Sequence, residues 1–515
     1  MDNSQALSSR TSTTMTLGRP RKLGIARPYH MLAQVFQIIW LAVICYNEYG
    51  TFRNHVSHCP WPDHSLLLST GTSSEDSPRP THVLVLADPQ VLDANSYPGR
   101  HPLLVWITRK TVDMNLRKSW RAALNLKPDA VVFLGDMMDN GRAAMSDEEY
   151  EDYYQHFRRI FRPASEDPLL TFYIPGNHDI GLGRSARFSE EALERYTSHF
   201  GPLNQLVDIG GHTLVMINAP GLVQEETLRA DDGLERDQWA LAHPTGTIAF
   251  VELLRSRRLH NPAVLFTHIP LSRPEGASCG PLRERGTIRE GRGFGYENTL
   301  APHTSQFLLQ TIRPALVFSG DDHDYCEYAH PYPTSPSHDP MLSDSPPGNV
   351  IEVTVKSFSI VMGIRQPGFQ LLSLSPLSAF SPPLPTLATT PCALPATLRT
   401  YLFLYAPLAA FTLLALLFAS AHRIRTRRRW EAWAPLPRWC ERLAVARGWS
   451  SNVSLCGRRV RVVWPIPNVL SQGEEGKIST GRTRAVGFWE GWARDVARVA
   501  WLPTLVFGGI AWWTA

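Results

Sequence analysis

Residues 131–140 have the sequence Val-Val-Phe-Leu-Gly-Asp-Met-Met-Asp-Asn, and this stretch decides the fold. Its short apolar run, bounded by glycine, is typical of a buried strand in an α/β sheet. Asp136 and Asp139 follow directly, with no basic residue between them. Open α/β sheets bind ligands beyond the carboxyl ends of their strands, and neighbouring carboxylates repel unless a cation or a shared proton compensates. The stretch therefore indicates a metal site, although a Gly-Asp turn after a strand is also a common structural feature.

The composition limits the class of protein. The chain has 515 residues, too many for one compact domain, which fits one large domain with appendages. The net charge of +4 is small for this length. A nucleic-acid-binding protein would need a local basic patch, so we expect no nucleic-acid partner. The 7 cysteines are too few for a disulfide scaffold.

Two uncharged stretches predict membrane spans, and a third is ambiguous. Residues 401–421 carry no charge, are long enough to cross a bilayer and are followed by arginines, as expected on a cytoplasmic flank. Residues 31–46 follow a basic segment. We favour an uncleaved anchor there over a signal peptide, because no small-residue cleavage site follows. Residues 499–515 form either a third span or a Trp-rich interfacial segment.

These spans place the segment between the first and the second outside the cytosol, in the lumen of the secretory pathway. The Asn452-Val453-Ser454 sequon falls on the cytosolic side, so glycosylation of Asn452 would contradict this topology. The predicted order is a cytosolic tail (1–30), an anchor (31–46), a lumenal linker (47–80), a large domain (81–372), a Pro/Ser-rich linker (373–400), a transmembrane helix (401–421), a basic cytosolic segment (422–498) and a possible third membrane segment (499–515).

Further apolar runs end in side chains that bind metals. We predict strands over 81–88, 169–174, 263–267 and 315–319, and an edge or antiparallel strand over 351–358. Helical spacing over 103–126 gives the βαβ pattern of a parallel sheet. A lone histidine after a strand is more often structural, but five such strand ends in one chain are hard to produce by chance. The strand ends carry Asp88, Asp136, Asn177 with His178, His268, and Asp321 with His323.

In combination and order, these motifs resemble the calcineurin-like metallophosphoesterase superfamily. Its pattern is D-x-H, GDxxD, GNHD/E, a lone His and GHxH, each on a loop after a strand. Residues 135–139 and 176–179 match in full, and the resemblance covers about residues 81–360. It implies a four-layer α/β/β/α sandwich, here with flanking transmembrane helices. It also implies two divalent metal ions that activate water for attack on phosphorus.

The resemblance implies a ligand set, with two departures from the pattern. Gln90 stands where the first motif has His, and Asp321 where the last motif has its first His. Both can offer oxygen to a cation, so we expect Mn²⁺ in preference to zinc. The alternative for Gln90 is that it coordinates nothing. Asp136 is expected to bridge the metals. The predicted metal ligands are Asp88, Gln90, Asp136, Asn177, His268, Asp321 and His323.

The catalytic residues implied by the resemblance are His178 and Asp179. His178 would donate a proton to the leaving oxygen or stabilise its charge, and Asp179 would orient His178. Asp139 and Asp322 are expected to support the ligands. Arg273, in a Pro-bounded loop, would bind the phosphate or a glycan hydroxyl, or is a solvated loop arginine.

Residues 318–328, 270–276 and 354–359 are similar to a fungal branch of membrane-anchored metallophosphoesterases that remodel GPI anchors and include a manganese-linked cell-division-control protein. This implies removal of an ethanolamine-phosphate branch from a GPI mannose in the endoplasmic reticulum or Golgi. The implied partners are a GPI-anchor glycolipid or a GPI-anchored protein, the membrane and cargo-export machinery.

Several alternatives stay open at this point. A phosphoprotein phosphatase can use the same fold, because a fold does not determine its substrate. A nuclease is disfavoured by the membrane anchors and the missing basic groove. A catalytically decayed cargo receptor or scaffold is suggested by Gln90 and Asp321. Cys279 and Cys326 form a disulfide or are two buried thiols, and Cys59 and Cys392 are the other lumenal candidates.

Overall fold

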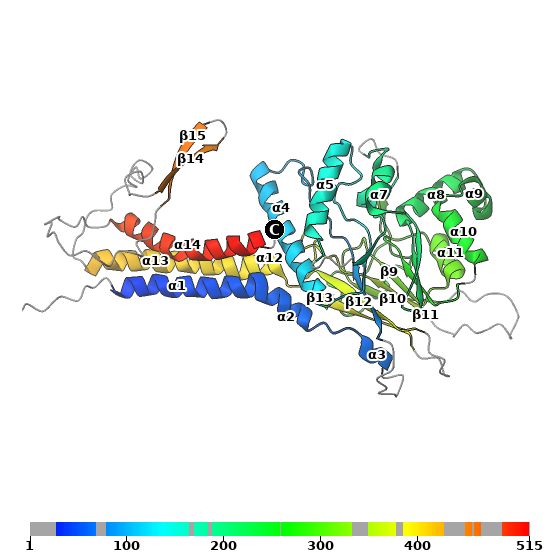
Figure 1. Cartoon of the computed structure of the whole chain (residues 1–515), viewed down its shortest axis with the longest axis horizontal. Coiled ribbons are helices and arrows are strands. Elements are labelled where there is room, and N and C mark those ends of the chain that lie inside the picture. The colour runs from blue at the N-terminus through cyan, green and yellow to red at the C-terminus, as the bar shows by residue number, and fades with distance from the viewer. Residues whose placement is uncertain are drawn as a thin grey trace, which may run out of the picture. The chain divides into compact units, whose positions relative to one another are not determined.

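The computed structural model of the chain describes most of its length (Figure 1). The described residues are 27–67, 79–163, 169–183, 188–257, 259–331, 349–376, 385–426, 449–455, 458–464 and 487–513. Most of the predicted tail at 1–30 and much of the basic segment at 422–498 lie outside them. Two compact units are present, one from 42–408 with 505–515, the other from 1–41 with 409–504.

Two sheets form the large unit, and parallel pairings bring the predicted strands together. In spatial order, the first sheet contains β13 (Leu387–Ala393), β12 (Gly368–Leu374), β1 (Thr81–Leu86), β2 (Ala130–Phe133) and β3 (Leu170–Tyr173). The second contains β10 (Cys326–Pro331), β11 (Asn349–Thr354), β9 (Leu316–Ser319), β6 (Ala263–Phe266), β5 (His212–Met216) and β4 (Gln205–Ile209).

Alternation along β1 shows why the central strands are continuous apolar runs. Val83 and Val85 pack into the core between the two sheets, whereas Leu84 and Leu86 pack into the core beneath the helices of the first sheet. A strand buried on both faces has no polar face to show in its sequence. The α/β class predicted from the sequence is confirmed, with two sheets packed face to face.

Helices cover the outer face of each sheet (Figure 1). The helices that pack on the first sheet are α4 (Pro102–Leu124), α5 (Asp147–Ile160) and α7 (Ala192–Phe200). Those on the second are α8 (Ala219–Asp231), α9 (Arg236–Ala242), α10 (Thr247–Ser256) and α11 (Pro302–Ile312). The start of α5 is determined locally by a capping box, in which Ser146 and Glu149 bond each other's backbone amides.

One sequence prediction about the end of the domain is wrong, and another is correct in part. The segment at 373–400, expected to be a linker, contains β13, which pairs with β12 and extends the first sheet. Pro391 is tolerated there because β13 is the edge strand. The strand predicted over 351–358 as an edge or antiparallel strand is β11. It is not an edge strand, because it lies between β10 and β9, but it pairs antiparallel with β10 as well as in parallel with β9.

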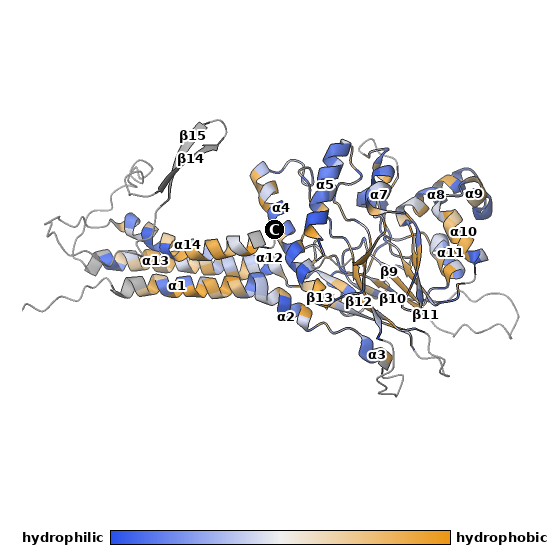
Figure 2. Ribbon diagram, in the orientation of Figure 1, coloured by the Kyte–Doolittle hydropathy of each residue, from blue (hydrophilic) through white to orange (hydrophobic). Residues whose placement is uncertain are grey.

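Two helical stretches among the described residues are long and apolar enough to cross a membrane, Met31–Ser57 and Thr397–Arg423. The first comprises most of α1 (Arg27–Cys45), then η1 (Tyr46–Gly50) and α2 (Thr51–Ser57), so helix replaces the beginning of the linker expected at 47–80. The short α3 (Asp63–Leu67) follows. The second contains α12 (Thr397–Thr400), η2 (Tyr401–Tyr405) and most of α13 (Ala406–Thr426). Figure 2 shows hydrophobic residues along α1 and α13.

The small unit is a bundle of helices. α14 (Phe488–Trp513) contains the ambiguous segment at 499–515 as far as Trp513, and its Val499 packs with Phe36 and Leu416. Arg423 forms an ion pair with Asp495. Whether α14 spans a membrane stays a prediction. A hairpin of β14 (Trp449–Leu455) and β15 (Arg458–Trp464) carries the Asn452 sequon.

Candidate metal centre

The predicted ligands come from loops at the carboxyl ends of five strands in the two sheets. Asp88 and Gln90 follow β1, Asp136 follows β2, Asn177 and His178 follow β3, His268 follows β6, and Asp321 and His323 follow β9. Parallel strands in both sheets turn these ends toward one place. The structure therefore brings together residues that lie up to 235 positions apart, as the hydrogen bond between the Asp321 amide and Asp88 Oδ1 shows (3.1 Å; sequence separation 233).

The backbone at the site is strained. Non-glycine residues rarely adopt positive φ, and holding one there costs of order 1–3 kcal/mol. The described residues include seven such positions, and five are predicted ligands. These five are Asp88 (φ 48°), Gln90 (φ 38°), Asp136 (φ 54°), Asp321 (φ 62°) and His323 (φ 70°). The surrounding structure holds these loops in orientations that the chain would not adopt alone.

Two glycines allow the loops to approach this closely. A Cβ on Gly135, whose φ is +93°, would lie 2.4 Å from His268 Nδ1. A Cβ on Gly176 would lie 2.1 Å from Asp136 Oδ1. Any side chain at either position would displace a predicted ligand. The glycines of the GD and GN motifs thus have a packing reason as well as a conformational one.

Oxygen atoms converge on His268, which is fully buried. Its Nδ1 lies 2.6 Å from the Leu134 carbonyl, so Nδ1 carries the proton and donates. Nε2 then presents a lone pair 3.1 Å from Asn177 Oδ1, 3.4 Å from Asp136 Oδ1 and 3.5 Å from Asp321 Oδ1. The Asn177 amide cannot turn its nitrogen inward, because Nδ2 donates to the Gly295 carbonyl (2.8 Å). A cation bound between these atoms would remove the repulsion between their lone pairs.

The two oxygens of Asp136 face different groups. Oδ1 accepts from the His178 backbone amide (2.8 Å) and lies on the His268 side. Oδ2 lies 2.9 Å from Gln90 Nε2, which is in turn 3.4 Å from His323 Nε2. Asp136 therefore lies between two sets of donors, as a bridging ligand must. The amide of Gln90 lies within the second set and can present either of its end atoms.

Asp88 supplies a direct test of whether the site fits a metal. Its Oδ2 is buried and has no hydrogen-bond partner. Leaving a carboxylate oxygen buried without a partner is costly, so this atom fits a role as a ligand of a cation. Asp88, Asp136 and His268 place one ligand atom each within 4.8 Å of one another. The oxygen and imidazole donors fit divalent cations.

The electrostatics of the cluster agree with this fit. Burial raises the pKa of Asp88 well above its usual value, and although His268 opposes the rise, Asp136 and Asp321 add to it. For Asp136, burial is outweighed by His268 and His178, which lower the pKa to about 2. Burial would lower the pKa of His268, but Asp136 and Asp321 raise it well above its usual value. The cluster thus has an excess of negative charge that cations would neutralise.

His178 differs from the ligands in its contacts. Its Nδ1 lies 2.6 Å from the Asp139 carbonyl oxygen and 3.6 Å from Asp139 Oδ1. Nδ1 therefore donates to the Asp139 carbonyl, which leaves Nε2 for a substrate. The side chain is partly exposed, whereas the ligand His268 is fully buried. This arrangement suits a group that contacts a substrate at the rim of a metal site.

The prediction that Asp179 orients His178 is wrong. Asp179 is fully buried, and its two oxygens accept from the Gly176 amide (2.9 Å) and the Met138 amide (3.2 Å). Burial, followed by the charge of Asp136, raises the pKa of Asp179 to about 7. Asp179 thus joins the Gly176 turn to the loop after Asp136. Asp139, expected only as support, is the residue that contacts the His178 ring.

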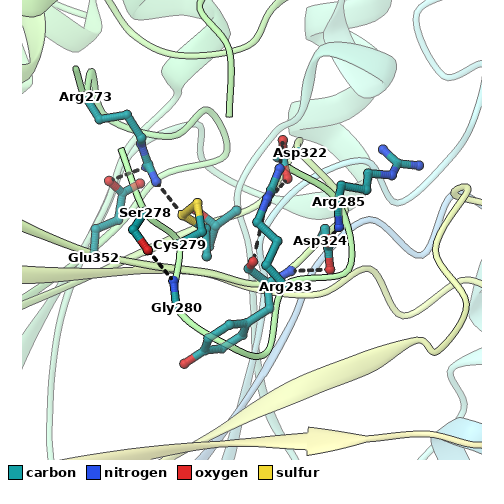
Figure 3. The surroundings of a disulfide bond; sticks show 12 residues. Arg273, Ser278, Cys279, Gly280, Arg283, Arg285, Asp322, Asp324 and Glu352 are labelled. Atoms are coloured by element: carbon teal, nitrogen blue, oxygen red, sulfur yellow. Dashed lines mark hydrogen bonds and ion pairs between the residues drawn. A yellow bond between two sulfur atoms is a disulfide. The ribbon is translucent and has the colours of Figure 1, made fainter. Parts of the chain in front are cut away.

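Arg273 contacts neither the candidate metal site nor the solvent, so both readings of it are wrong. Its Nη2 forms an ion pair with Glu352 Oε2 (2.7 Å), and both side chains are buried. Figure 3 shows this pair beside the Cys279–Cys326 disulfide, whose Cys326 Sγ lies 2.9 Å from Arg273 Nη1. Burial alone would raise the pKa of Glu352, but Arg273 and His330 outweigh it and lower the pKa.

Replacing Arg273 by Met is expected to reduce the free energy of unfolding by about 3–5 kcal/mol, because the buried Glu352 would lose its guanidinium partner and keep only His330. Urea unfolding of the full chain in detergent measures the change. The control is Arg79→Met, whose partner Asp129 is exposed and whose loss should cost less than about 1 kcal/mol. A raised KM with unchanged stability would instead support the substrate-binding interpretation.

Cys279 and Cys326 form a disulfide, so the alternative of two buried thiols is wrong. The disulfide fastens a loop against the Asp321–His323 turn (Figure 3). In that loop Arg283 binds both oxygens of Asp322 (2.6 and 3.1 Å). The amides of Glu284 and Arg285 donate to Asp324 Oδ2 at 2.8 Å each. Asp322 and Asp324 therefore hold the ligand turn in place, a role that sequence reasoning gave only to Asp322.

Arg142 is the residue that sequence reasoning missed. Its Nη1 donates to the Asn177 carbonyl (2.9 Å) and to the Gly295 carbonyl (3.1 Å), and its guanidinium lies 5.0 Å from the centre of the Phe188 ring. Gly295 lies between β7 (Arg292–Gly293) and β8 (Tyr296–Glu297). Arg142 thus joins this hairpin to the loop that carries Asn177 and His178. The only sequence signal was its place three residues after Asp139.

Replacing Arg142 by Ala is expected to lower kcat/KM by about 10–100-fold, the usual cost of losing a residue that orients metal ligands. The loss follows because the Asn177 and Gly295 carbonyls would both lose their bond to Arg142, which leaves only the Asn177 Nδ2 bond to Gly295 between the loop and the hairpin. Kinetics and metal content of the full chain, both measured in detergent, test this. Arg158→Ala, at an exposed position on α5, is the control. Unchanged kinetics in Arg142→Ala would contradict the role.

Comparisons with known proteins agree with the site. The family model described as "Calcineurin-like phosphoesterase" matches residues 81–325. Cell division control protein 1 of Saccharomyces cerevisiae is 33% identical over 354 residues, which cover 68% of this chain and 65% of that protein. Metallophosphoesterase 1 of Mus musculus is 27% identical over 335 residues, covering 62% of this chain and 75% of that protein. The Caenorhabditis elegans homolog is 25% identical over 295 residues, covering 56% and 70%.

The matched residues contain all the predicted ligands. The chain belongs to the calcineurin-like metallophosphoesterases through this domain, and the suspected family is confirmed. Members of this family are metal-dependent phosphoester hydrolases, and the candidate metal site is the one on which such chemistry depends. The chain spans 65% of the length of its yeast relative.

Proposed function

We propose that this chain is a lumenal phosphodiesterase that removes an ethanolamine-phosphate side branch from a GPI-anchor mannose and so supports maturation and export of GPI-anchored proteins. The observation that carries the proposal is the position of Asp136, whose two oxygens face two donor sets within a calcineurin-like domain. The finer parts of the proposal, which are the substrate, the compartment and the metal, rest on the arguments below.

The donor set supports manganese. Five of the seven predicted ligands offer oxygen: Asp88, Gln90, Asp136, Asn177 and Asp321. Oxygen-rich sites with some imidazole favour Mn²⁺ or Mg²⁺ over zinc. When bound, two such cations neutralise phosphate charge and lower the pKa of an attacking water. We expect one to be held by Asp88, Asp136, His323 and Gln90, and the other by Asp136, Asn177, His268 and Asp321.

The chain's own residues provide proton transfer and orientation. His178, once protonated, donates from Nε2 to the departing alkoxide, while its Nδ1 stays bonded to the Asp139 carbonyl. The Asp139 carboxylate, 3.6 Å from Nδ1, stabilises the imidazolium form that donates this proton. Arg142 keeps Asn177 and the β7–β8 hairpin in register with His178. These roles suit a phosphodiester whose leaving group is a sugar alkoxide, because such a group needs a proton.

Cysteine pairing supports a lumenal location. The four cysteines that lie between the two candidate spans form two disulfides, Cys59–Cys392 and Cys279–Cys326. Disulfides persist in the secretory pathway and are rare in the cytosol. Cys45, inside the first candidate span, is free. Together with the two apolar helices, this pairing favours a membrane protein whose catalytic domain faces the lumen of the endoplasmic reticulum or Golgi.

An aromatic hairpin supports a glycan as substrate over a phosphopeptide. Phe294 and Tyr296 are 63% and 45% exposed, although aromatic side chains are usually covered. Their hairpin is joined to the site through the bonds from Asn177 and Arg142 to Gly295. Sugar rings present apolar C–H faces that stack on aromatic rings. A phosphoprotein phosphatase, the rival function, would not need these two exposed rings to bind its substrate.

One assay tests the proposal. The full chain with Mn²⁺ is incubated with an ethanolamine-phosphate-bearing GPI glycan and, in parallel, with phosphopeptides. Cleavage of the glycan alone supports the proposal, whereas cleavage of phosphopeptides alone favours the phosphatase. No turnover of either substrate by a metal-loaded chain favours the decayed receptor or scaffold. Peptide mapping of the non-reduced protein checks the two disulfides independently.

A further inference from the structure

The first turns of α4 expose a row of large apolar side chains. Leu103, Leu104, Trp106 and Ile107 are 57%, 56%, 57% and 45% exposed, and we call these four residues the apolar end of α4. Figure 2 shows the hydrophobic colour at this end of the helix. Only Val105 within the row is buried. Scattered exposed apolar residues are ordinary, but four within five positions indicate an interaction surface.

The same helix is bonded to both candidate membrane spans. Lys118 Nζ donates to Glu48 Oε2 (2.5 Å) in the first span, and both groups are buried. Asn115 Nδ2 donates to Thr397 Oγ1 (2.9 Å), and Thr397 is the first residue of the second span. α4 is therefore fastened where both spans join the catalytic domain. The hydroxyl of Tyr405 also donates to Glu48 (2.8 Å).

Geometry places the apolar end close to that junction. Asn115 and Leu104 are eleven residues apart, which is roughly 16 Å along a helix axis. Figure 1 shows α4 beside α12, the start of the second span, to which Asn115 is bonded. The apolar end would then reach the surface of the bilayer that the spans enter.

The chemistry of this end suits a lipid surface. Arg100 and Lys110, which flank the row, are exposed. Leucine and tryptophan on one side with basic residues beside them are the composition of helices that lie in the membrane interface. Tryptophan in particular prefers the headgroup region.

We propose that the apolar end of α4 inserts into the headgroup region of the membrane leaflet that the two candidate spans enter. α4 would then be a membrane contact in addition to the spans. Because β2 and Asp136 follow α4 directly in the chain, this contact would set the orientation of the metal site toward a substrate carried by a lipid. The inference rests on the membrane anchorage in the proposed function but not on the identity of the substrate.

The first test is a fluorescence measurement on the full chain in liposomes. Cys45, Cys440 and Cys456 are replaced by Ser, and an environment-sensitive dye is attached at Leu104→Cys or, as a control, at Leu241→Cys. Leu241 on α9 is 85% exposed and lies on the second sheet's helices. We expect a blue-shifted emission, quenched by spin-labelled lipids, at position 104 only. Equal emission at both positions, or a shift that depends on protein concentration in detergent and so indicates a second copy, would overturn the proposal.

The second test separates lipid contact from folding and from substrate identity. The double variant Leu104→Glu/Trp106→Glu should hydrolyse a lipid-embedded phosphodiester at least about tenfold more slowly, the equivalent of one lost leucine burial. Its turnover of bis-p-nitrophenyl phosphate should not change. Equal losses on both substrates would mean that the row supports the fold and would overturn the proposal. Lipid quenching at position 104 in a chain that does not cleave GPI glycans would reject the proposed substrate while supporting the membrane contact.

Discussion

Replacing Asp136 by Asn is expected to abolish phosphodiester hydrolysis and to reduce the metal content of the protein. The loss should exceed the roughly 10–100-fold that follows removal of a residue that merely orients a ligand. The reason is geometric, because Oδ1 and Oδ2 of Asp136 face the His268 and Gln90 sides of the cluster respectively. An amide has one oxygen and no charge, so Asn can serve only one side.

Two measurements check this prediction on the full chain in detergent. Elemental analysis gives the number of bound metal ions, and hydrolysis of bis-p-nitrophenyl phosphate gives kcat/KM. The control is Asp147→Asn, a carboxylate that is 87% exposed at the start of α5. A variant at position 136 that kept two metal ions and normal turnover would show that Asp136 does not bridge them.

Replacing His178 by Gln is expected to lower kcat by about 10²–10⁴-fold for substrates with an alkoxide leaving group, the usual contribution of a general acid. Substrates that release p-nitrophenolate should lose much less, because that leaving group departs without a proton. Metal content should be unchanged, since the contact of His178 with Asp136 is made by its backbone amide. The difference between the two substrate classes distinguishes proton donation from ligation.

The comparison variant is His199→Gln, a histidine on α7 that contacts Glu151 near the surface. Its kinetics should match those of the unaltered chain for both classes of substrate. Equal losses on both classes by His178→Gln, accompanied by metal loss, would show that His178 is a ligand. Equal losses with full metal content would leave it a role in binding the phosphate.

Most of the candidate site was predictable from the sequence because its signals are local. A short apolar run followed by Gly-Asp or Gly-Asn-His-Asp identifies a strand and the side chains at its end, and both depend on adjacent residues. The α/β class follows from the same runs. The departures Gln90 and Asp321 were also visible in the sequence, and the structure places both within the cluster.

The errors concern residues whose partners are distant in the chain. Arg273 is paired with Glu352, 79 positions away. No local sequence pattern around Arg273 indicates that its partner is a buried carboxylate. Asp179 follows His178 directly, yet its carboxylate accepts from the Met138 amide, 41 positions away, and the His178 ring is held by Asp139, 39 positions away. The segment at 387–393 appeared to be a linker because an edge strand can contain Pro391 and polar residues.

By itself, the sequence determined which side chains could hold metals and on which strand ends they stand, because both depend on short-range patterns. It also determined the two helices that are long and apolar enough to cross a membrane, because length and hydrophobicity are properties of a segment. The tertiary structure alone decided that Asp136 faces two donor sets, that Arg142 joins Asn177 to a hairpin, and that α4 is bonded to both spans. Each of these depends on how distant segments pack against one another. That packing is determined jointly by loop closure and burial, so no single segment of the sequence reveals it.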